Sequence, residues 1–263
     1  MSGTTGVMVD RMWRLVATAL CFATFGVGGV FIGTVVYPIL RFTSPDAATG
    51  AYRAQALIHY KFQFFVLIMQ NLGVITLEVR GAERLGRGGQ LILPNHPSLI
   101  DVVILISLLR QTNCIVKEAL WQNPFIRGPV VGAGYIKNCA GPELIEASVR
   151  ALERGENLIV FPEGTRSVPN EPFRLQRGAA TIAVRAKCIV TPVIITVSTP
   201  FLTKGEKWYR VPPVRPHITV EVKDDIDMEA FRTPKINASK AARQLTRWLQ
   251  SYFTTEVGHI AAA

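Results

Sequence analysis

The chain has 263 residues, of which 49% are hydrophobic, and its 29 Lys and Arg against 19 Asp and Glu give a formal net charge of +10. This length suits one catalytic domain with a membrane segment, and no shift in composition marks a second independent domain. The mean hydropathy of +0.25, without an aromatic RNA-binding signature or zinc-ligand spacing, argues against a nucleic-acid-binding protein. We therefore attribute the basic excess to contact with anionic lipid headgroups.

The first apolar run covers residues 15–40, contains no charged residue and lies between Arg14 and Arg41. At about 1.5 Å per residue, a helix of this length crosses a hydrocarbon core of about 30 Å. The run is too long for a signal-peptide core, so we predict a retained membrane anchor. Its glycines permit close helix packing or a bend as readily as a straight span, so we expect a single helix or a helical hairpin, and arginines at both ends leave the orientation open.

A second apolar stretch covers residues 62–77. It predicts a membrane-lying helix that runs into a strand near residues 75–79, while a buried helix of the globular domain fits equally well. We place the membrane-associated part at residues 1–78 and the catalytic domain at residues 79–263.

Short apolar runs alternate with helical patterns through the rest of the chain. The predicted strands cover residues 91–93, 114–116, 135–136, 158–161, 189–197 and 217–222, and the predicted helices cover residues 102–109, 143–154, 179–186 and 239–253. This interleaving indicates an α/β fold with a mixed, largely parallel sheet flanked by helices.

The cysteines are scattered along the chain and none forms a CxxC pair: Cys21, Cys114, Cys139 and Cys188. Each lies in an apolar context, which is typical of free buried thiols in a reducing compartment. We predict neither a metal site nor a cofactor.

The sequence NHPSLID at residues 95–101 follows the apolar run 90–94. It places His96 at the end of a strand, where an α/β sheet carries its reactive groups, and Asp101 just over one helical turn away. An imidazole oriented by a carboxylate is suited to act as a general base near neutral pH. Ser98 lies between them but lacks the Gly-x-Ser-x-Gly elbow of a serine nucleophile, so we favour direct attack by an acceptor hydroxyl.

The sequence FPEGTRS at residues 161–167 follows another predicted strand. It contributes Glu163, Gly164, Thr165 and Arg166 to a glycine turn. A guanidinium fork beside free backbone amides is suited to a phosphate monoester.

The sequences NHPSLID, GAGYIKN, FPEGTRS and VTPVII occur in this order between about residues 79 and 197. They resemble the four motif blocks of the glycerolipid acyltransferase family, which includes 1-acyl-sn-glycerol-3-phosphate acyltransferases. The resemblance implies that His96 is the catalytic base and that Asp101 orients it. It also implies that the third block binds the acceptor's phosphate with Arg166 as the main clamp, while Glu163 orders the loop or binds glycerol hydroxyls.

The second block departs from the family pattern, because GAGYIKN ends in Asn138 where many members have an arginine. Lys137 replaces the missing charge only if its side chain does not point to the opposite face of a strand. Lys117 and Arg177 are further candidates for the anion site, Arg177 because it precedes a predicted helix. The departure at Asn138 bears on the choice of acceptor.

The resemblance implies an O-acyltransferase that moves a fatty acyl group from an acyl carrier protein or coenzyme A thioester to a lysophospholipid, by default converting lysophosphatidic acid to phosphatidic acid. We expect it in a membrane, specifically a bacterial inner membrane with the active site on the cytoplasmic face. The alternatives are another acceptor, such as lyso-ornithine lipid or a specialised lipid precursor, a hydrolase, and a non-catalytic lipid-binding homologue.

Overall fold

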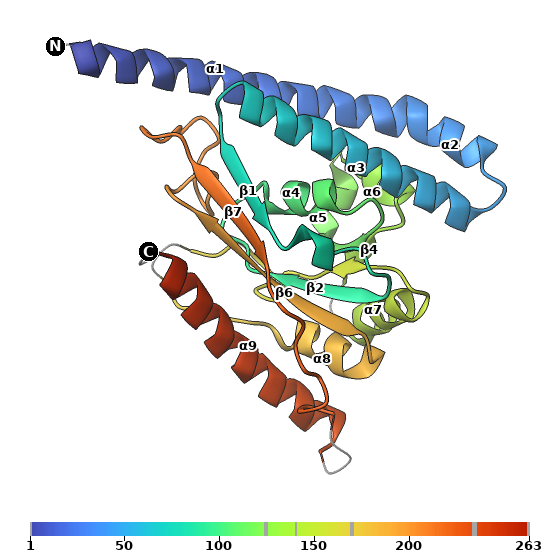
Figure 1. Cartoon of the computed structure of the whole chain (residues 1–263). Helices are drawn as coiled ribbons and strands as arrows, with labels where there is room; N and C mark the ends of the chain where they lie inside the picture. The colour runs from blue at the N-terminus through green and yellow to red at the C-terminus, as the bar shows by residue number, and fades with distance from the viewer. Residues whose placement is uncertain (1, 124–125, 140, 169–170, 233–235, 262–263) are drawn as a thin grey trace.

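The computed structural model describes residues 2–123, 126–139, 141–168, 171–232 and 236–261 (Figure 1). Within these residues the core is a seven-stranded sheet in the order β1-β7-β6-β2-β5-β3-β4. Every neighbouring pair is parallel except β6 and β7, which confirms the predicted mixed, largely parallel sheet. The strands are β1 Thr76–Arg80, β2 Gln90–Pro94, β3 Asn113–Lys117, β4 Ile136–Asn138, β5 Leu158–Ile159, β6 Ile189–Val197 and β7 His217–Val222.

Helices cover both faces of this sheet (Figure 1). The helices are α1 Ser2–Phe31, α2 Tyr37–Thr43, α3 Ala47–Asn71, α4 Asp101–Leu108, α5 Glu118–Gln122, α6 Arg127–Gly132, α7 Pro142–Glu153, α8 Arg177–Ala186 and α9 Ala238–Ala261. Two hydrophobic clusters separate accordingly: Ile92 of β2 packs on the α3 and α4 side, while Leu91 and Leu93 pack on the α7, α8 and α9 side. Because successive strand residues face opposite ways, a strand covered on both faces is apolar throughout.

The N-terminal helices form one long apolar element. A π-helical turn, Ile32–Val36, joins α1 to α2 without a break, and Gly6–Thr43 is the one segment in the described part of the chain that is long and apolar enough to cross a membrane by length and composition. Gly33 in this turn approaches the backbone of Gly128 in α6 so closely that a Cβ on Gly128 would collide with it. The glycines of this region therefore serve close packing.

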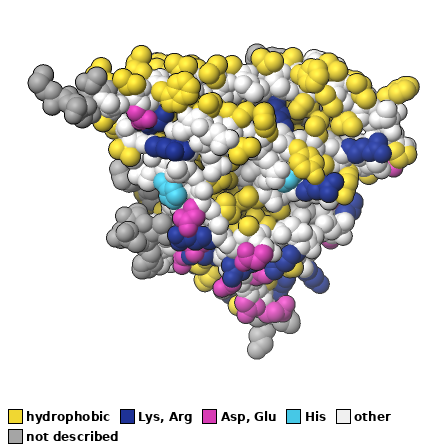
Figure 2. Space-filling view, turned by 45° about the horizontal axis from the view of Figure 1, so that its top comes forward, with side chains coloured by type: hydrophobic (Ala, Val, Ile, Leu, Met, Phe, Trp, Pro, Cys, Tyr) yellow, Lys and Arg dark blue, Asp and Glu magenta, His cyan; other side chains and the backbone are white. Residues whose placement is uncertain are grey.

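A continuous hydrophobic surface runs along these helices, and Figure 2 shows it along the top of the molecule. Its large exposed side chains on α1 and α2 include Val7, Met8, Met12, Trp13, Leu20, Val27, Phe31, Ile39 and Phe42. Burying such side chains stabilises a contact by roughly 25 cal/mol per Å² of apolar area. An apolar exterior of this extent indicates contact with a nonpolar phase or another surface.

Helix α3 begins earlier than the apolar stretch at residues 62–77 suggests. Asp46 caps its amino end by accepting a hydrogen bond from the Thr49 N–H. One face buries Phe65 and Met69 in the core beside α4, whereas Phe64 and Leu67 are exposed on the other face. The buried face of α3 fits the interpretation as a helix of the globular domain, while contact of the exposed face with a membrane stays a prediction. The boundary expected between residues 78 and 79 falls inside β1, and the division into two domains stays a prediction.

Candidate active site

The motif loops meet at one edge of the sheet. Strands β2, β5, β3 and β4 are parallel neighbours, so their carboxyl ends share an edge. Ile92 of β2 is in register with Ile159 of β5, and His96 and Glu163 each lie four residues further along. The third motif loop, residues 161–167, is therefore placed between the first motif loop, residues 95–101, and the ends of β3 and β4.

The structure brings His96 and Asp101 into direct contact. Asp101 Oδ2 accepts a hydrogen bond from His96 Nδ1 at 2.9 Å and another from the Ser98 N–H at 2.7 Å. The Asp101 side chain is fully buried, while that of His96 is 18% exposed. With Nδ1 donating to the carboxylate, Nε2 is the nitrogen left to take a proton from a substrate.

The electrostatics of the pair depend on this contact. Burial raises the pKa of Asp101 above its ordinary value, and the hydrogen bonds from His96 and Ser98 oppose that rise. Among the described residues, Asp101 Oδ1 is buried without a hydrogen-bond partner. Both hydrogen bonds that compensate the buried carboxylate therefore fall on Oδ2, the oxygen that faces the imidazole.

Phe161 holds the imidazole from its face. The rings of His96 and Phe161 are stacked with centroids 4.1 Å apart and an interplanar angle of 29°. Together with Asp101, this contact fixes both the plane and the rotation of the imidazole. The sequence interpretation missed Phe161; the available signal was an aromatic residue ending the strand that neighbours the His96 strand.

Asn95 is a second positioning residue that the sequence interpretation missed. Its buried amide donates to Ile195 O at 2.8 Å, and its Oδ1 accepts from the Ile195 N–H at 2.7 Å. These bonds extend the pairing of β2 with β6 beyond Pro94, so the chain leaves the sheet at a fixed point directly before His96. An amide at the end of an otherwise apolar run was the signal.

Glu163 binds the backbone of the first motif loop. Its Oε1 accepts from the His96 N–H at 3.0 Å and from Ser167 Oγ at 2.8 Å, and the Ser167 N–H donates to His96 O at 2.7 Å. Burial raises the pKa of Glu163, against the lowering effect of these hydrogen bonds. Of the two roles considered for Glu163, this geometry corresponds to ordering the loop.

Gly164 allows the third motif loop to turn. It has φ +67°, a conformation in which an L side chain is strained, and a Cβ there would lie 3.4 Å from Gln176 Cγ. Its N–H donates to Phe161 O at 3.0 Å, and the Gln176 N–H donates to Pro162 O at 2.7 Å. The turn leaves Thr165 partly exposed and brings the start of α8 beside the loop.

One nitrogen of the Arg166 guanidinium is already hydrogen-bonded within the protein. Its Nη1 donates to Leu202 O at 3.0 Å and to Thr203 O at 2.9 Å, both in the loop between β6 and β7. The Leu99 N–H donates to the same Leu202 oxygen at 3.0 Å. Among the described residues no further hydrogen bond of Arg166 is found, so Nε and Nη2 remain for an anion.

The remaining predicted binding residues are exposed at or near the same edge. Lys117 and Asn138 are register partners at the ends of β3 and β4. Lys137 Nζ pairs with Glu118 Oε1 at 2.6 Å, so its charge is compensated locally. Arg177 is the first residue of α8 and follows the Gln176 contact to the third motif loop.

Two other expectations bear on the chemistry. Ser98 is buried and its Oγ accepts from the Ile100 N–H at 3.1 Å, which leaves it poorly placed as a nucleophile. In the described part of the chain no group of three or more His, Cys, Asp or Glu is placed to hold a metal ion.

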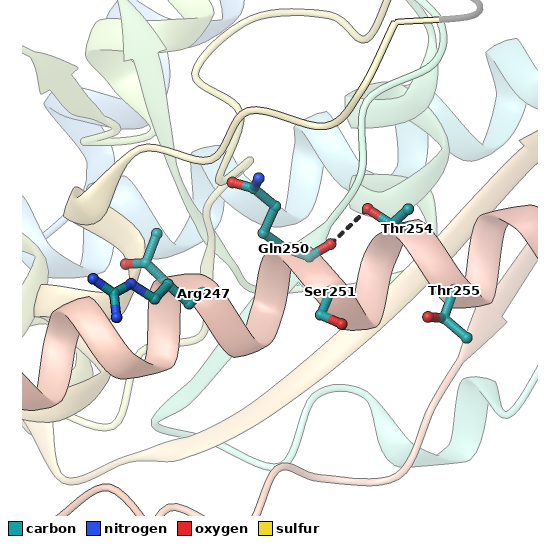
Figure 3. A pocket seen from close by; sticks show the side chains of 6 residues that line it. Arg247, Gln250, Ser251, Thr254 and Thr255 are labelled. Carbon is teal, nitrogen blue, oxygen red and sulfur yellow. Dashed lines mark hydrogen bonds between the residues drawn. The ribbon is translucent and has the colours of Figure 1, made fainter.

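A surface pocket on α9 is lined by residues outside the motif loops (Figure 3): Thr246, Arg247, Gln250, Ser251, Thr254 and Thr255.

Comparison with known proteins shows which family the part of the chain around this edge resembles. A family model described as Acyltransferase matches residues 76–196, which contain both motif loops. A 1-acyl-sn-glycerol-3-phosphate acyltransferase from Helicobacter pylori is 30% identical over 115 residues, 41% of this chain and 48% of that protein. One from Pseudomonas aeruginosa is 23% identical over 189 residues, 68% of this chain and 70% of that protein. The chain spans about half the length of most curated relatives it matches.

A solved structure shares the fold across almost the whole chain. The crystal structure of the 1-acyl-sn-glycerophosphate (LPA) acyltransferase PlsC from Thermotoga maritima superposes with a TM-score of 0.74, covering 97% of this chain and 98% of that chain at 19% identity. At this identity the likeness supports the fold alone. Residues 76–196, which contain both motif loops, are thus similar to the Acyltransferase family, and the likeness over the rest of the chain is one of fold.

Proposed function

We propose that the protein is an O-acyltransferase that moves a fatty acyl group from an acyl carrier protein or coenzyme A thioester to the free hydroxyl of a lysophospholipid. The observation that carries this proposal is the His96 Nδ1 contact to the buried Asp101, which leaves Nε2 to face an acceptor. The similarity of residues 76–196 to the Acyltransferase family model supports the acyl chemistry.

The chemistry follows from the pair. The acceptor hydroxyl oxygen bonds to the thioester carbonyl carbon, the carbon–sulfur bond breaks, and the hydroxyl proton passes through His96 Nε2 to the departing thiolate. Asp101 stabilises the imidazolium while it holds the proton. Water at the acceptor position would give free fatty acid instead, so a bound lyso-lipid must exclude it.

Lysophosphatidic acid is the proposed default acceptor. The curated relatives are named for 1-acyl-sn-glycerol-3-phosphate, and the proposal assigns the phosphate to Arg166, which in the described part of the chain forms hydrogen bonds only through Nη1. Asn138 is the observation that favours another acceptor, such as lyso-ornithine lipid. A non-catalytic homologue is disfavoured because the His96, Asp101 and Glu163 contacts are all in place.

The function is tested by product analysis. The full chain is given labelled acyl-CoA or acyl carrier protein thioester together with lysophosphatidic acid, lyso-ornithine lipid or a phosphate-free lyso-lipid. We expect labelled phosphatidic acid. Labelled free fatty acid alone would indicate a hydrolase, and no turnover with any acceptor would indicate a binding protein.

Arg166→Ala is expected to lower kcat/KM about tenfold or more for phosphate-bearing acceptors and less for phosphate-free ones, because a lost charged hydrogen bond costs roughly 1.5–3 kcal/mol. Arg166→Lys is also expected to be impaired, since one ammonium cannot both hold Leu202 O and present a fork to phosphate. Arg174→Ala, at an exposed arginine in the segment before α8, is the matched control. Equal losses on both acceptor classes would assign Arg166 a structural role.

We further propose that the hydrophobic surface of α1 and α2 and the exposed face of α3 hold the protein on a membrane. The exposed apolar side chains and the apolar Gly6–Thr43 segment support this location. A bacterial inner membrane with a cytoplasmic active site is the specific form of the proposal.

The full chain is expected to stay in the membrane fraction through a high-salt wash, since salt screens headgroup attraction but not apolar burial. Deletion of residues 1–40 is expected to weaken attachment without abolishing it. The exposed face of α3 and the basic residues of the rest of the chain would still bind the membrane. Sedimentation followed by immunoblotting of both fractions is the measurement. Release of the full chain by salt alone would contradict apolar anchoring.

A further inference from the structure

The loop between β6 and β7, residues 198–216, has an exposed basic and aromatic centre between buried residues at 201–203 and at Val211. Trp208 and Tyr209 are 44% and 47% exposed. Around them Lys204, Lys207 and Arg210 are exposed, and Glu206 is the one acidic residue between positions 204 and 210. Lys207 Nζ lies 5.6 Å from the Tyr209 ring centroid. The catalytic chemistry leaves this centre unexplained.

The far half of the β6–β7 loop is fastened to α1. Arg14 donates from Nη1 to Pro212 O at 2.9 Å and from Nη2 to Pro213 O at 2.7 Å, and Arg11 Nε donates to Val211 O at 3.1 Å. The Arg14 side chain is only 1% exposed and also pairs with Asp10. A buried guanidinium is tolerated when its donors are satisfied, so this docking of the loop on α1 is specific.

The attachment places the exposed centre beside the hydrophobic surface of α1. The rings of Trp208 and Phe22 have centroids 6.3 Å apart, and Val214 in the same loop is 62% exposed. In Figure 1 the loop rises from the sheet toward the first half of α1. Tryptophan and tyrosine collect at the level of lipid headgroups, and nearby lysine and arginine attract anionic lipids.

We propose that the β6–β7 loop is a docking surface for anionic phospholipid headgroups, with Trp208 and Tyr209 at the interface and Lys204, Lys207 and Arg210 on lipid phosphates. The inference rests on the proposed membrane location and adds a headgroup contact outside the apolar helices. Continuity with the exposed side chains of α1 favours a bilayer over an acidic protein as the partner.

This docking would also fix the distance between the catalytic edge of the sheet and the membrane surface. The near end of the same loop supplies Leu202 O and Thr203 O to Arg166, and Leu202 O also accepts from the Leu99 N–H. Leu202 is buried with φ +55°, a left-handed conformation uncommon for a branched side chain. The segment formed by Leu202 and Thr203 thus connects the exposed centre of the β6–β7 loop to both motif loops.

The test uses the full chain reconstituted in zwitterionic vesicles with or without anionic phospholipid, with bromine atoms on the acyl chains near the glycerol. Bromine quenches nearby tryptophan, and subtracting the signal of Trp208→Phe isolates Trp208. We expect Trp208 to be quenched more strongly when anionic lipid is present. The triple variant Lys204→Glu, Lys207→Glu and Arg210→Glu is expected to lose most of that quenching and its dependence on anionic lipid.

A matched charge reversal controls for net charge. The exposed α9 residues Lys240, Arg243 and Arg247 (Figure 3 shows Arg247) are changed together to glutamate and are expected to leave Trp208 quenching unchanged. Unquenched Trp208 in protein that still sediments with vesicles would overturn the loop proposal while the membrane location stands. Equal effects of the two triple variants would overturn the specific headgroup contact. Shielding of Trp208 only after addition of acyl carrier protein would replace the bilayer with a protein partner, and failure to sediment would remove the membrane location itself.

Discussion

Replacing His96 with alanine is expected to lower turnover by about 10²–10⁴-fold, the usual contribution of a general base. The substitution removes the one ring nitrogen that the structure leaves facing outward while Nδ1 is bonded to Asp101. The backbone contacts of His96 to Glu163 and Ser167 do not depend on the side chain, so the third motif loop should keep its place. Steady-state rates on the preferred acceptor, with circular dichroism of the purified variant, measure the effect.

His217→Ala is the matched control for this variant. His217 is an exposed histidine at the start of β7 that contacts Thr76 and Glu78, and its loss is expected to leave turnover near that of the unmodified protein. A folded His96→Ala protein that retained most of its activity would remove the central mechanistic claim.

Asp101→Asn is expected to be nearly as damaging, although it preserves shape. Asp101 Oδ2 accepts from both His96 Nδ1 and the Ser98 N–H, and an amide can satisfy both with its oxygen but cannot stabilise the imidazolium. If the amide nitrogen faces the ring instead, the imidazole is held in the tautomer that cannot accept a proton at Nε2. The corresponding change in a serine protease triad costs about 10⁴-fold.

The plateau of kcat/KM, measured together with circular dichroism of the purified variant, distinguishes this loss from simple misfolding. An amide cannot stabilise the imidazolium that forms during proton transfer, so the plateau is expected to fall while the spectrum of the folded protein is kept. Asp227→Asn, at an exposed aspartate that accepts from the Glu229 N–H, is the control. A plateau close to that of the unmodified protein would show that Asp101 is not required.

Much of the fold follows from sequence because its strands are apolar on both faces. The runs near residues 91–93 and 189–197 match β2 and β6 closely. A strand covered by helices on both sides buries both of its faces, so nearly all of its residues are apolar. Helices α5 and α6 were missed because they are five and six residues long, too short to show a helical period. Helix α3 was ambiguous because its core face and its outer face are both apolar.

The site was predictable where the chemistry lies within a single motif. His96 and Asp101 are five positions apart, so local geometry alone brings them together. The hydrogen bonds from Arg166 to Leu202 O and Thr203 O were not predictable. The acceptors are backbone carbonyls thirty-six and thirty-seven positions away, and a carbonyl is present at every position whatever the residue type. The catalytic roles of His96 and Asp101 and the roles of the substrate-binding residues all stay predictions.

The paired bonds that join His96 N–H and C=O to the third motif loop have a consequence for recombination between relatives. A segment exchange that imported only residues 95–101 would leave Glu163 and Ser167 facing a foreign main chain and would risk misplacing the imidazole. Importing both segments together, with the host strands retained, would carry the interlocked bonds intact. The smallest transferable unit of the proposed site is therefore discontinuous in sequence, and graded chimeras should regain activity only when both halves come from one parent.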